Sequence, residues 1–150
     1  MTLQTGDSAP RVEAENQHGE AVTPEFSEPT VVYFYPRDDT PGCTVEAEQF
    51  DREIESYRDA DVTVYGVSTD DVESHAEFAD EYDLDFDLLA DPDAELADAF
   101  GVDTARGAAA RTTFVLADGE VRAVYEGVDP DGHAREVLDD LLDEGLASLD

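Results

Sequence analysis

The segment from Thr30 to Tyr35 is an unbroken run of β-branched and aromatic residues, Thr-Val-Val-Tyr-Phe-Tyr. These residue types favour strands, and a run without polar alternation predicts a strand that is buried on both faces. Such a strand needs a central position in a sheet that helices cover on both sides. The run therefore predicts an α/β fold.

The rest of the chain supplies the other elements of such a fold. Turn residues at Asn16 to Gly19 and at Ala117 to Glu120 each indicate a hairpin, and apolar residues at helical spacing alternate with short apolar strands. No linker, repeat or low-complexity segment divides the sequence, so we expect a single domain over residues 1–150. We expect a hairpin within 12–22, strands at 30–35, 62–68, 86–89, 111–116 and 121–125, and helices at 43–58, 71–82, 96–100 and 131–146.

The charge balance is extreme, with 40 acidic residues against 8 basic ones and a formal net charge of −32. The acids interrupt regular hydrophobic patterns, which indicates an acidic surface on a folded domain, not a disordered tail. Repulsion among these charges strains the folded state at ordinary salt and is screened at multi-molar salt, where the Debye length falls below about 3 Å. We therefore expect the cytoplasm of an extreme halophile. A basic partner or Ca²⁺ is the alternative, and nucleic acid and anionic membranes are disfavoured.

The sequence also indicates a location inside the cell. No apolar stretch approaches the length of a membrane span, and residues 1–7 lack the features of a signal peptide. The chain has one cysteine, which argues against a secreted, disulfide-stapled domain. We expect a cytoplasmic protein that binds neither membrane nor nucleic acid.

That one cysteine, Cys43, lies where the buried strand ends and a helix begins. A helix N-terminus stabilises an anion, and thiol chemistry depends on the thiolate. Because a lone cysteine cannot form an intrachain disulfide, a functional Cys43 must act as a nucleophile, a redox centre or a ligand. An inert core residue is the plainer alternative.

The residues around Cys43 resemble the active-site segment of the peroxiredoxins, and most of all the bacterioferritin-comigratory-protein (PrxQ) subfamily. The similarity includes Tyr33 to Pro36, Thr40 to Ala47, Gly66 to Asp70, Leu88 to Asp91, Phe100 to Val102 and Arg111 to Val115. It covers nearly the whole chain. The resemblance implies a thioredoxin-like fold with an N-terminal β-hairpin extension and a mixed central sheet flanked by helices.

The resemblance also implies a thiol-dependent peroxidase that reduces hydrogen peroxide and organic hydroperoxides. Cys43 would attack the peroxide and become a sulfenic acid. Arg111 would hold the thiolate and polarise the O–O bond, and Glu46 would orient that arginine. The hydroxyl of Thr40 could bind the peroxide, and Pro36 would stiffen the loop.

The chain departs from much of the subfamily at position 48. Many members carry a resolving cysteine five residues after the first, and this chain has Glu48 there. The expected cycle therefore has one cysteine and depends on an external thiol or a thioredoxin-like reductant, through a mixed or an intersubunit disulfide. The subfamily suggests a monomer or weak dimer, and no cofactor is implied. A non-catalytic redox sensor or adaptor is the alternative, and a disulfide reductase is disfavoured because no Cys-x-x-Cys pair exists.

The three histidines, His18, His75 and His133, have no spacing that suggests a metal site, and we expect all three to be solvent-exposed. Asp129 to Gly132 lacks the remaining ligands of a calcium loop. No metal site is expected.

Overall fold

The fold was described from a computed structural model, and the description covers residues 2–38, 40–104 and 108–146. Seven strands form one mixed sheet in the order β2-β1-β5-β4-β3-β6-β7. The strands are β1 (Ala14–Glu15), β2 (Ala21–Val22), β3 (Thr30–Phe34), β4 (Thr63–Ser68), β5 (Asp87–Ala90), β6 (Thr112–Ala117) and β7 (Glu120–Glu126). The helices are α1 (Pro41–Arg52), α2 (Ile54–Asp59), α3 (Val72–Tyr82), α4 (Glu95–Phe100) and α5 (His133–Asp143).

The predicted central strand is confirmed. All five residues of β3 are buried, and β3 lies between β4, to which it is parallel, and β6, to which it is antiparallel. The predicted α/β class, mixed sheet and N-terminal hairpin are confirmed as well. The position of β3 in the sheet therefore determines where the following turn and the start of α1 lie.

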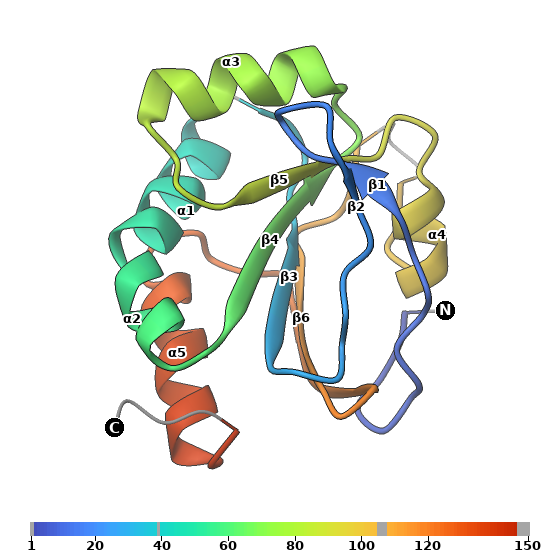
Figure 1. The fold of residues 1–150 in the computed structure, drawn as a ribbon, viewed down its shortest axis with the longest axis vertical. Coiled ribbons are helices and arrows are strands. Elements are labelled where there is room, and N and C mark those ends of the chain that lie inside the picture. The colour runs from blue at the N-terminus through green and yellow to red at the C-terminus, as the bar shows by residue number, and fades with distance from the viewer. Residues whose placement is uncertain (1, 39, 105–107, 147–150) are drawn as a thin grey trace.

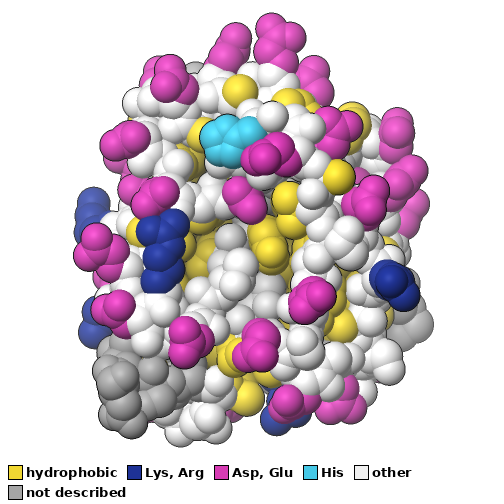
Figure 2. Space-filling model, in the orientation of Figure 1, with side chains coloured by type: hydrophobic (Ala, Val, Ile, Leu, Met, Phe, Trp, Pro, Cys, Tyr) yellow, Lys and Arg dark blue, Asp and Glu magenta, His cyan; other side chains and the backbone are white. Residues whose placement is uncertain are grey.

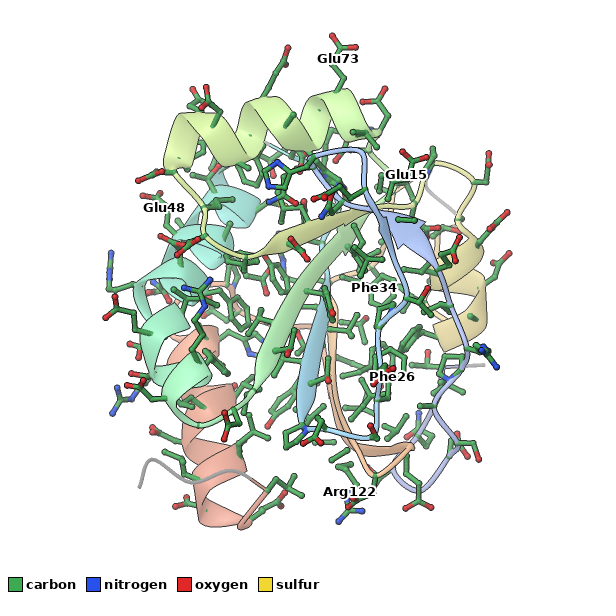
Figure 3. All side chains as sticks on the ribbon, in the orientation of Figure 1. Glu15, Phe26, Phe34, Glu48, Glu73 and Arg122 are labelled. Carbon is green, nitrogen blue, oxygen red and sulfur yellow. The ribbon has the colours of Figure 1, made fainter. Side chains whose placement is uncertain are left out.

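Helices cover both faces of the sheet (Figure 1). On one face α1, α2, α3 and α5 enclose a core that includes Tyr33, Phe50 and Leu138. On the other face α4 packs with Phe26 and Phe34, whose rings lie 6.1 and 5.4 Å from the ring of Phe100 (Figure 3). The sheet is thus buried on both sides, as the apolar run requires.

Two local features of the sequence explain where α3 begins and where α4 ends. The side chain of Asp71 caps α3 by accepting a hydrogen bond from the Ser74 amide at 2.9 Å. Gly101 ends α4 in the left-handed conformation, with φ of 71°, which glycine adopts without strain.

One predicted element is wrong. The expected single helix over 43–58 is two helices, because Glu53 leaves helical geometry with φ of −94° and ψ of 2°. Hydrogen bonds continue across the break, from the Glu53 amide to Gln49 and from the Tyr57 amide to Glu53. The bend allows Ile54 and Tyr57 to join the same core as Phe50, so packing overrides the local helical pattern.

Acidic side chains are spread across the visible face of the molecule (Figure 2) and project outward, as Glu48 and Glu73 do in Figure 3. Among the described residues no helix is long and apolar enough to cross a membrane. The charge is therefore a property of the surface, as its spread along the sequence predicts.

Candidate active site at the start of helix α1

Cys43 is the third residue of α1, and its side chain is 1% exposed. Thr40 is the N-cap residue in an extended conformation, and Pro41 takes the first helical position, where a missing N–H costs little. The amides of a first helical turn point toward the helix start, and this positive end of the helix favours a thiolate. The thiol is thus buried at a position suited to an anion.

Arg111 reaches this thiol from the neighbouring strand. It directly precedes β6, whose first residue, Thr112, pairs with Phe34 at the end of β3. Its Nη2 atom lies 3.4 Å from Sγ of Cys43 and its Nη1 atom lies 2.5 Å from Oε1 of Glu46. The guanidinium therefore bridges the thiol and a carboxylate that both belong to α1.

Glu46 is fully buried on the side of α1 that carries Cys43. Burial raises the pKa of its carboxyl to about 7, and the charge and hydrogen bond of Arg111 offset only part of this effect. Its second oxygen, Oε2, has no hydrogen-bond partner among the described residues. Glu46 thus pairs with Arg111 at a cost in desolvation.

Gly42 leaves the space that this arrangement needs. A Cβ atom at this position would lie 3.2 Å from Nη2 of Arg111 and 3.6 Å from Cγ of Pro130. The first distance is tighter than an ordinary carbon–nitrogen contact, so a side chain here would displace the guanidinium.

The structure places the other two predicted residues in the same turn. Pro36 is half-buried two residues after the end of β3, and the hydroxyl of Thr40 donates a hydrogen bond to the Arg37 carbonyl at 3.1 Å. Cys43, Arg111 and Glu46 thus form one contact group, and Thr40 and Pro36 belong to the segment that leads into it.

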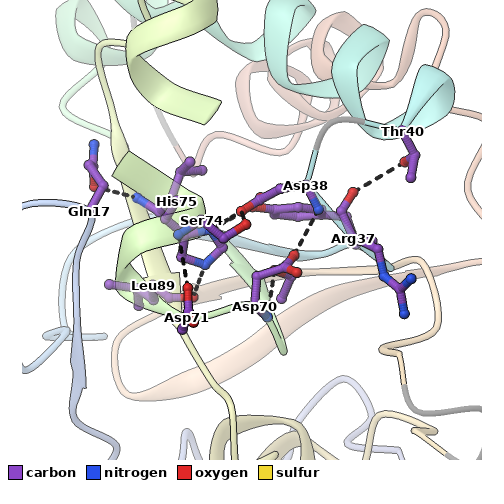
Figure 4. Close-up of polar contacts among 12 residues, drawn as sticks. Gln17, Arg37, Asp38, Thr40, Asp70, Asp71, Ser74, His75 and Leu89 are labelled. Atoms are coloured by element: carbon purple, nitrogen blue, oxygen red, sulfur yellow. Dashed lines mark hydrogen bonds and ion pairs between the residues drawn. The ribbon is translucent and has the colours of Figure 1, made fainter. Parts of the chain in front are cut away.

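Sequence reasoning missed a second polar group beside this turn. The carboxylate of Asp38 accepts hydrogen bonds from the hydroxyls of Tyr35 at 2.6 Å and Ser74 at 2.7 Å, and it lies 2.7 Å from Nδ1 of His75 (Figure 4). The expected exposure of His75 is wrong, because its side chain is fully buried in α3. The helical spacing in the sequence could have revealed this burial, since His75 shares the buried face of α3 with Phe78 and Ala79 at positions i+3 and i+4.

The expected exposure of His133 is also wrong, whereas His18 is exposed as predicted. His133 is 3% exposed, and its Nε2 atom lies 2.8 Å from the hydroxyl of Thr113. Burial lowers its pKa, and the hydrogen bond and charge of Glu136 only partly oppose this. Its ring packs edge-on against Phe50 and Tyr125, so it acts as a core residue between α5 and the sheet.

Comparison with known proteins identifies relatives of this site and fold. Residues 5–124 match the family model of the AhpC/TSA family. Peroxiredoxin Bcp of Bacillus subtilis is 42% identical over 104 residues, which cover 68% of this chain and 66% of that protein. A putative peroxiredoxin bcp of Coxiella burnetii is 34% identical over 148 residues, which cover 92% of this chain and 98% of that protein.

Solved structures agree with the sequence relatives. Peroxidoxin BcpB of Mycobacterium tuberculosis superposes with a TM-score of 0.87 at 33% identity, covering 94% of this chain and 97% of that one. A PrxQ mutant of Xylella fastidiosa superposes with a TM-score of 0.90 at 29% identity, covering 97% and 99%. The bacterioferritin comigratory protein of Xanthomonas campestris, which is described as reducing alkyl peroxides, superposes with a TM-score of 0.82 at 31% identity, covering 89% and 91%.

Proposed function

The chain belongs to the AhpC/TSA family and within it to the Bcp/PrxQ peroxiredoxins, which are thiol-dependent peroxidases, and on this premise we propose a one-cysteine cycle centred on Cys43. The observation that carries the proposal is the 3.4 Å contact between Nη2 of Arg111 and the Cys43 sulfur. This contact supports the proposal, because a permanent positive charge beside the sulfur would stabilise both a thiolate and the oxygen of an attacked peroxide.

In the first step the Cys43 thiolate attacks one oxygen of the peroxide. The S–O bond forms as the O–O bond breaks, the second oxygen leaves as an alkoxide or hydroxide, and a proton converts it to alcohol or water. Sulfur is oxidised to a sulfenic acid and the peroxide is reduced. Hydrogen peroxide and organic hydroperoxides both satisfy this chemistry.

We assign the supporting roles by position. Arg111 stabilises the thiolate and the charge that develops on the leaving oxygen, and Glu46 holds Arg111 in place through Nη1. Thr40 offers a hydroxyl to the peroxide once it exchanges its bond to the Arg37 carbonyl, and Pro36 stiffens the chain after β3.

The sulfenic acid requires an external reductant, since the sequence has one cysteine and position 48 is an exposed glutamate. A first thiol condenses with the sulfenic acid to a mixed disulfide and releases water. A second thiol then releases the Cys43 thiol and leaves as a disulfide. A small thiol or a thioredoxin-like protein supplies these two groups, and the enzyme works as a monomer or weak dimer.

The acidic surface leads us to propose a salt-rich cytoplasm as the working environment. Acidic side chains are distributed over the visible face without gathering in one patch (Figure 2), which fits screening by salt better than one basic partner.

Stopped-flow loss of the Cys43 thiol with hydrogen peroxide in multi-molar KCl tests the proposal. The wild type should react orders of magnitude faster than free cysteine, and Arg111→Ala should lose about 10²- to 10³-fold in rate. Arg122→Ala is the matched control, because its partners among the described residues are surface acids on the β6–β7 hairpin. If the wild type and Arg111→Ala both react like free cysteine, Cys43 is not a peroxidatic centre and the redox-sensor function replaces the peroxidase.

A further inference from the structure

Asp38 makes more hydrogen bonds than an acidic residue on the surface usually does. It is 8% exposed, and three side chains converge on its carboxylate, that of Tyr35 just after β3 and those of Ser74 and His75 in α3 (Figure 4). Its backbone amide donates to Oδ2 of Asp70 at 2.7 Å, and Asp70 also accepts from Ser68 at the end of β4. One residue thus ties the turn after β3 to α3 and to the β4–α3 connection.

The positions of the hydrogen-bond acceptors determine where the protons of His75 must lie. Nε2 of His75 lies 3.0 Å from the Leu89 carbonyl, which can only accept, so Nε2 carries a proton. Nδ1 faces Oδ2 of Asp38 at 2.7 Å, and two acceptors cannot meet at this distance without a proton between them.

The proton between Nδ1 and Oδ2 belongs to the histidine. Asp38 already accepts from the hydroxyls of Tyr35 and Ser74, and donors of this kind favour the carboxylate form. Burial, followed by the charge of Asp38, raises the pKa of Tyr35 well above its ordinary range, so this hydroxyl stays a donor. The groups that face His75 are therefore the Asp38 carboxylate, the Tyr35 ring, the Leu89 carbonyl and, behind Asp38, the Asp70 carboxylate.

A bound metal explains this cluster less well. Ligand atoms of Asp38, Asp70 and His75 lie within 4.8 Å of one another. With Zn–N and Zn–O bonds of about 2.0 to 2.1 Å, however, tetrahedral ligand atoms lie about 3.3 Å apart. The 2.7 Å between Nδ1 and Oδ2 is a hydrogen-bond distance, not a distance between two ligands of one ion.

We propose that His75 is a positioning residue of the peroxidatic site, which as a buried imidazolium locks Asp38, and with it the turn that leads to Thr40 and Cys43, against α3. Asp38 lies five residues before Cys43, and this turn sets where α1 begins. The inference rests on the proposed peroxidase function, because the site that it positions is the site of that reaction. With the lock in place, Cys43 stays buried beside Arg111.

Nitrogen-15 NMR of histidine-labelled protein at pH 7.5 tests the protonation state directly, with His75→Gln used for assignment. Both ring nitrogens of His75 should be protonated in the wild type. In Asp38→Asn the amide can donate to Nδ1, so one ring nitrogen should be protonated. A wild-type His75 with a single protonated nitrogen, or a stoichiometric metal found by elemental analysis, would overturn the proposal.

A comparison of two reactions of Cys43 tests the positioning role. His75→Gln should lower the rate with hydrogen peroxide by on the order of 10- to 100-fold and raise the rate of alkylation by iodoacetamide, because Cys43 leaves its aligned and buried position. His75→Asn should keep the peroxide rate within a few-fold of wild type, because the asparagine amide can replace Nδ1–H as the donor to Asp38.

Phe78→Leu, one turn further along α3, is the matched control for a simple loss of stability. Because a phenylalanine side chain cannot hydrogen-bond to Asp38, this change should leave both rates within a few-fold of wild type. Peroxide and alkylation rates of His75→Gln that are unchanged, or that change no more than those of Phe78→Leu, would overturn the positioning role. A wild type that reacts with peroxide like free cysteine would instead refute the peroxidase function, and the NMR and alkylation results would still decide whether the lock exists.

Discussion

Gly42 is the residue that lets Arg111 approach the thiol. A Cβ atom on Gly42 would lie 3.2 Å from Nη2 of Arg111, and the same nitrogen lies 3.4 Å from the Cys43 sulfur. The helix start and the arginine are therefore fitted to each other without space for a methyl group.

Gly42→Ala should separate activity from stability. Alanine is the better helix former by about 0.5 to 1 kcal/mol, which should offset much of the cost of the tight contact in the free energy of unfolding. The displaced guanidinium should lower the rate of Cys43 oxidation by roughly tenfold, which stopped-flow kinetics measures. Glu48→Ala, an exposed change in the same helix, should leave that rate within a few-fold, and a Gly42→Ala enzyme as fast as wild type would contradict this account of the contact.

Glu46→Gln should reveal the cost of the buried carboxylate. The folded pKa of Glu46 is raised from 4.5 to about 7, so between these values the folded state holds more protons than the unfolded state. Its contribution to stability is then largest below pH 4.5 and is lost as the pH rises to about 7. The unfolding free energy of wild type minus that of Glu46→Gln should fall by roughly 3 kcal/mol from pH 4.5 to 8, at about 1.4 kcal/mol per pKa unit.

Urea unfolding of both proteins at one salt concentration checks this difference. Subtraction of the variant removes the contribution of the other acids, which the two proteins share. A difference that stays constant or grows with pH would mean that the Arg111 ion pair outweighs burial.

Tyr33→Phe should be neutral or stabilising in spite of full burial. The Tyr33 hydroxyl has no hydrogen-bond partner among the described residues, so its loss removes an unsatisfied polar group. Tyr57→Phe is the matched comparison, because the Tyr57 hydroxyl donates to the Ala134 carbonyl at 2.6 Å and its loss should cost about 1 to 3 kcal/mol. If Tyr33→Phe and Tyr57→Phe lower the free energy of unfolding equally, the prediction that only the Tyr57 hydroxyl stabilises the fold is wrong.

The rate of Cys43 with hydrogen peroxide should rise by a few-fold with KCl. Asp38 and Glu46 are engaged by His75 and Arg111, whereas Glu48 is exposed and its charge is open to screening by salt. The partly buried Arg111 contact is screened less. Glu48→Gln should flatten the salt dependence, and a rate that stays flat or falls with KCl while circular dichroism shows an intact fold would refute the hypothesis.

The sequence predicted those parts of the fold that depend on neighbouring residues. The buried strand β3 follows from its apolar run, and the limits of α3 and α4 lie close to the predicted ranges because a capping aspartate and a glycine are local features of the chain. The break at Glu53 could not be predicted, because both sides of it carry a helical pattern and only the packing of Ile54 and Tyr57 decides it.

The sequence by itself determined that the chain forms a covered mixed sheet and that Cys43 stands at a helix start, since strand burial and helix onset follow from the order of nearby residues. Tertiary structure alone decided what surrounds that thiol. The antiparallel pairing of β3 with β6 brings Arg111 to Cys43 across 68 positions, and the packing of α3 brings His75 to Asp38 across 37. Whether a polar side chain is buried depends on such distant partners, and a single sequence does not encode them locally.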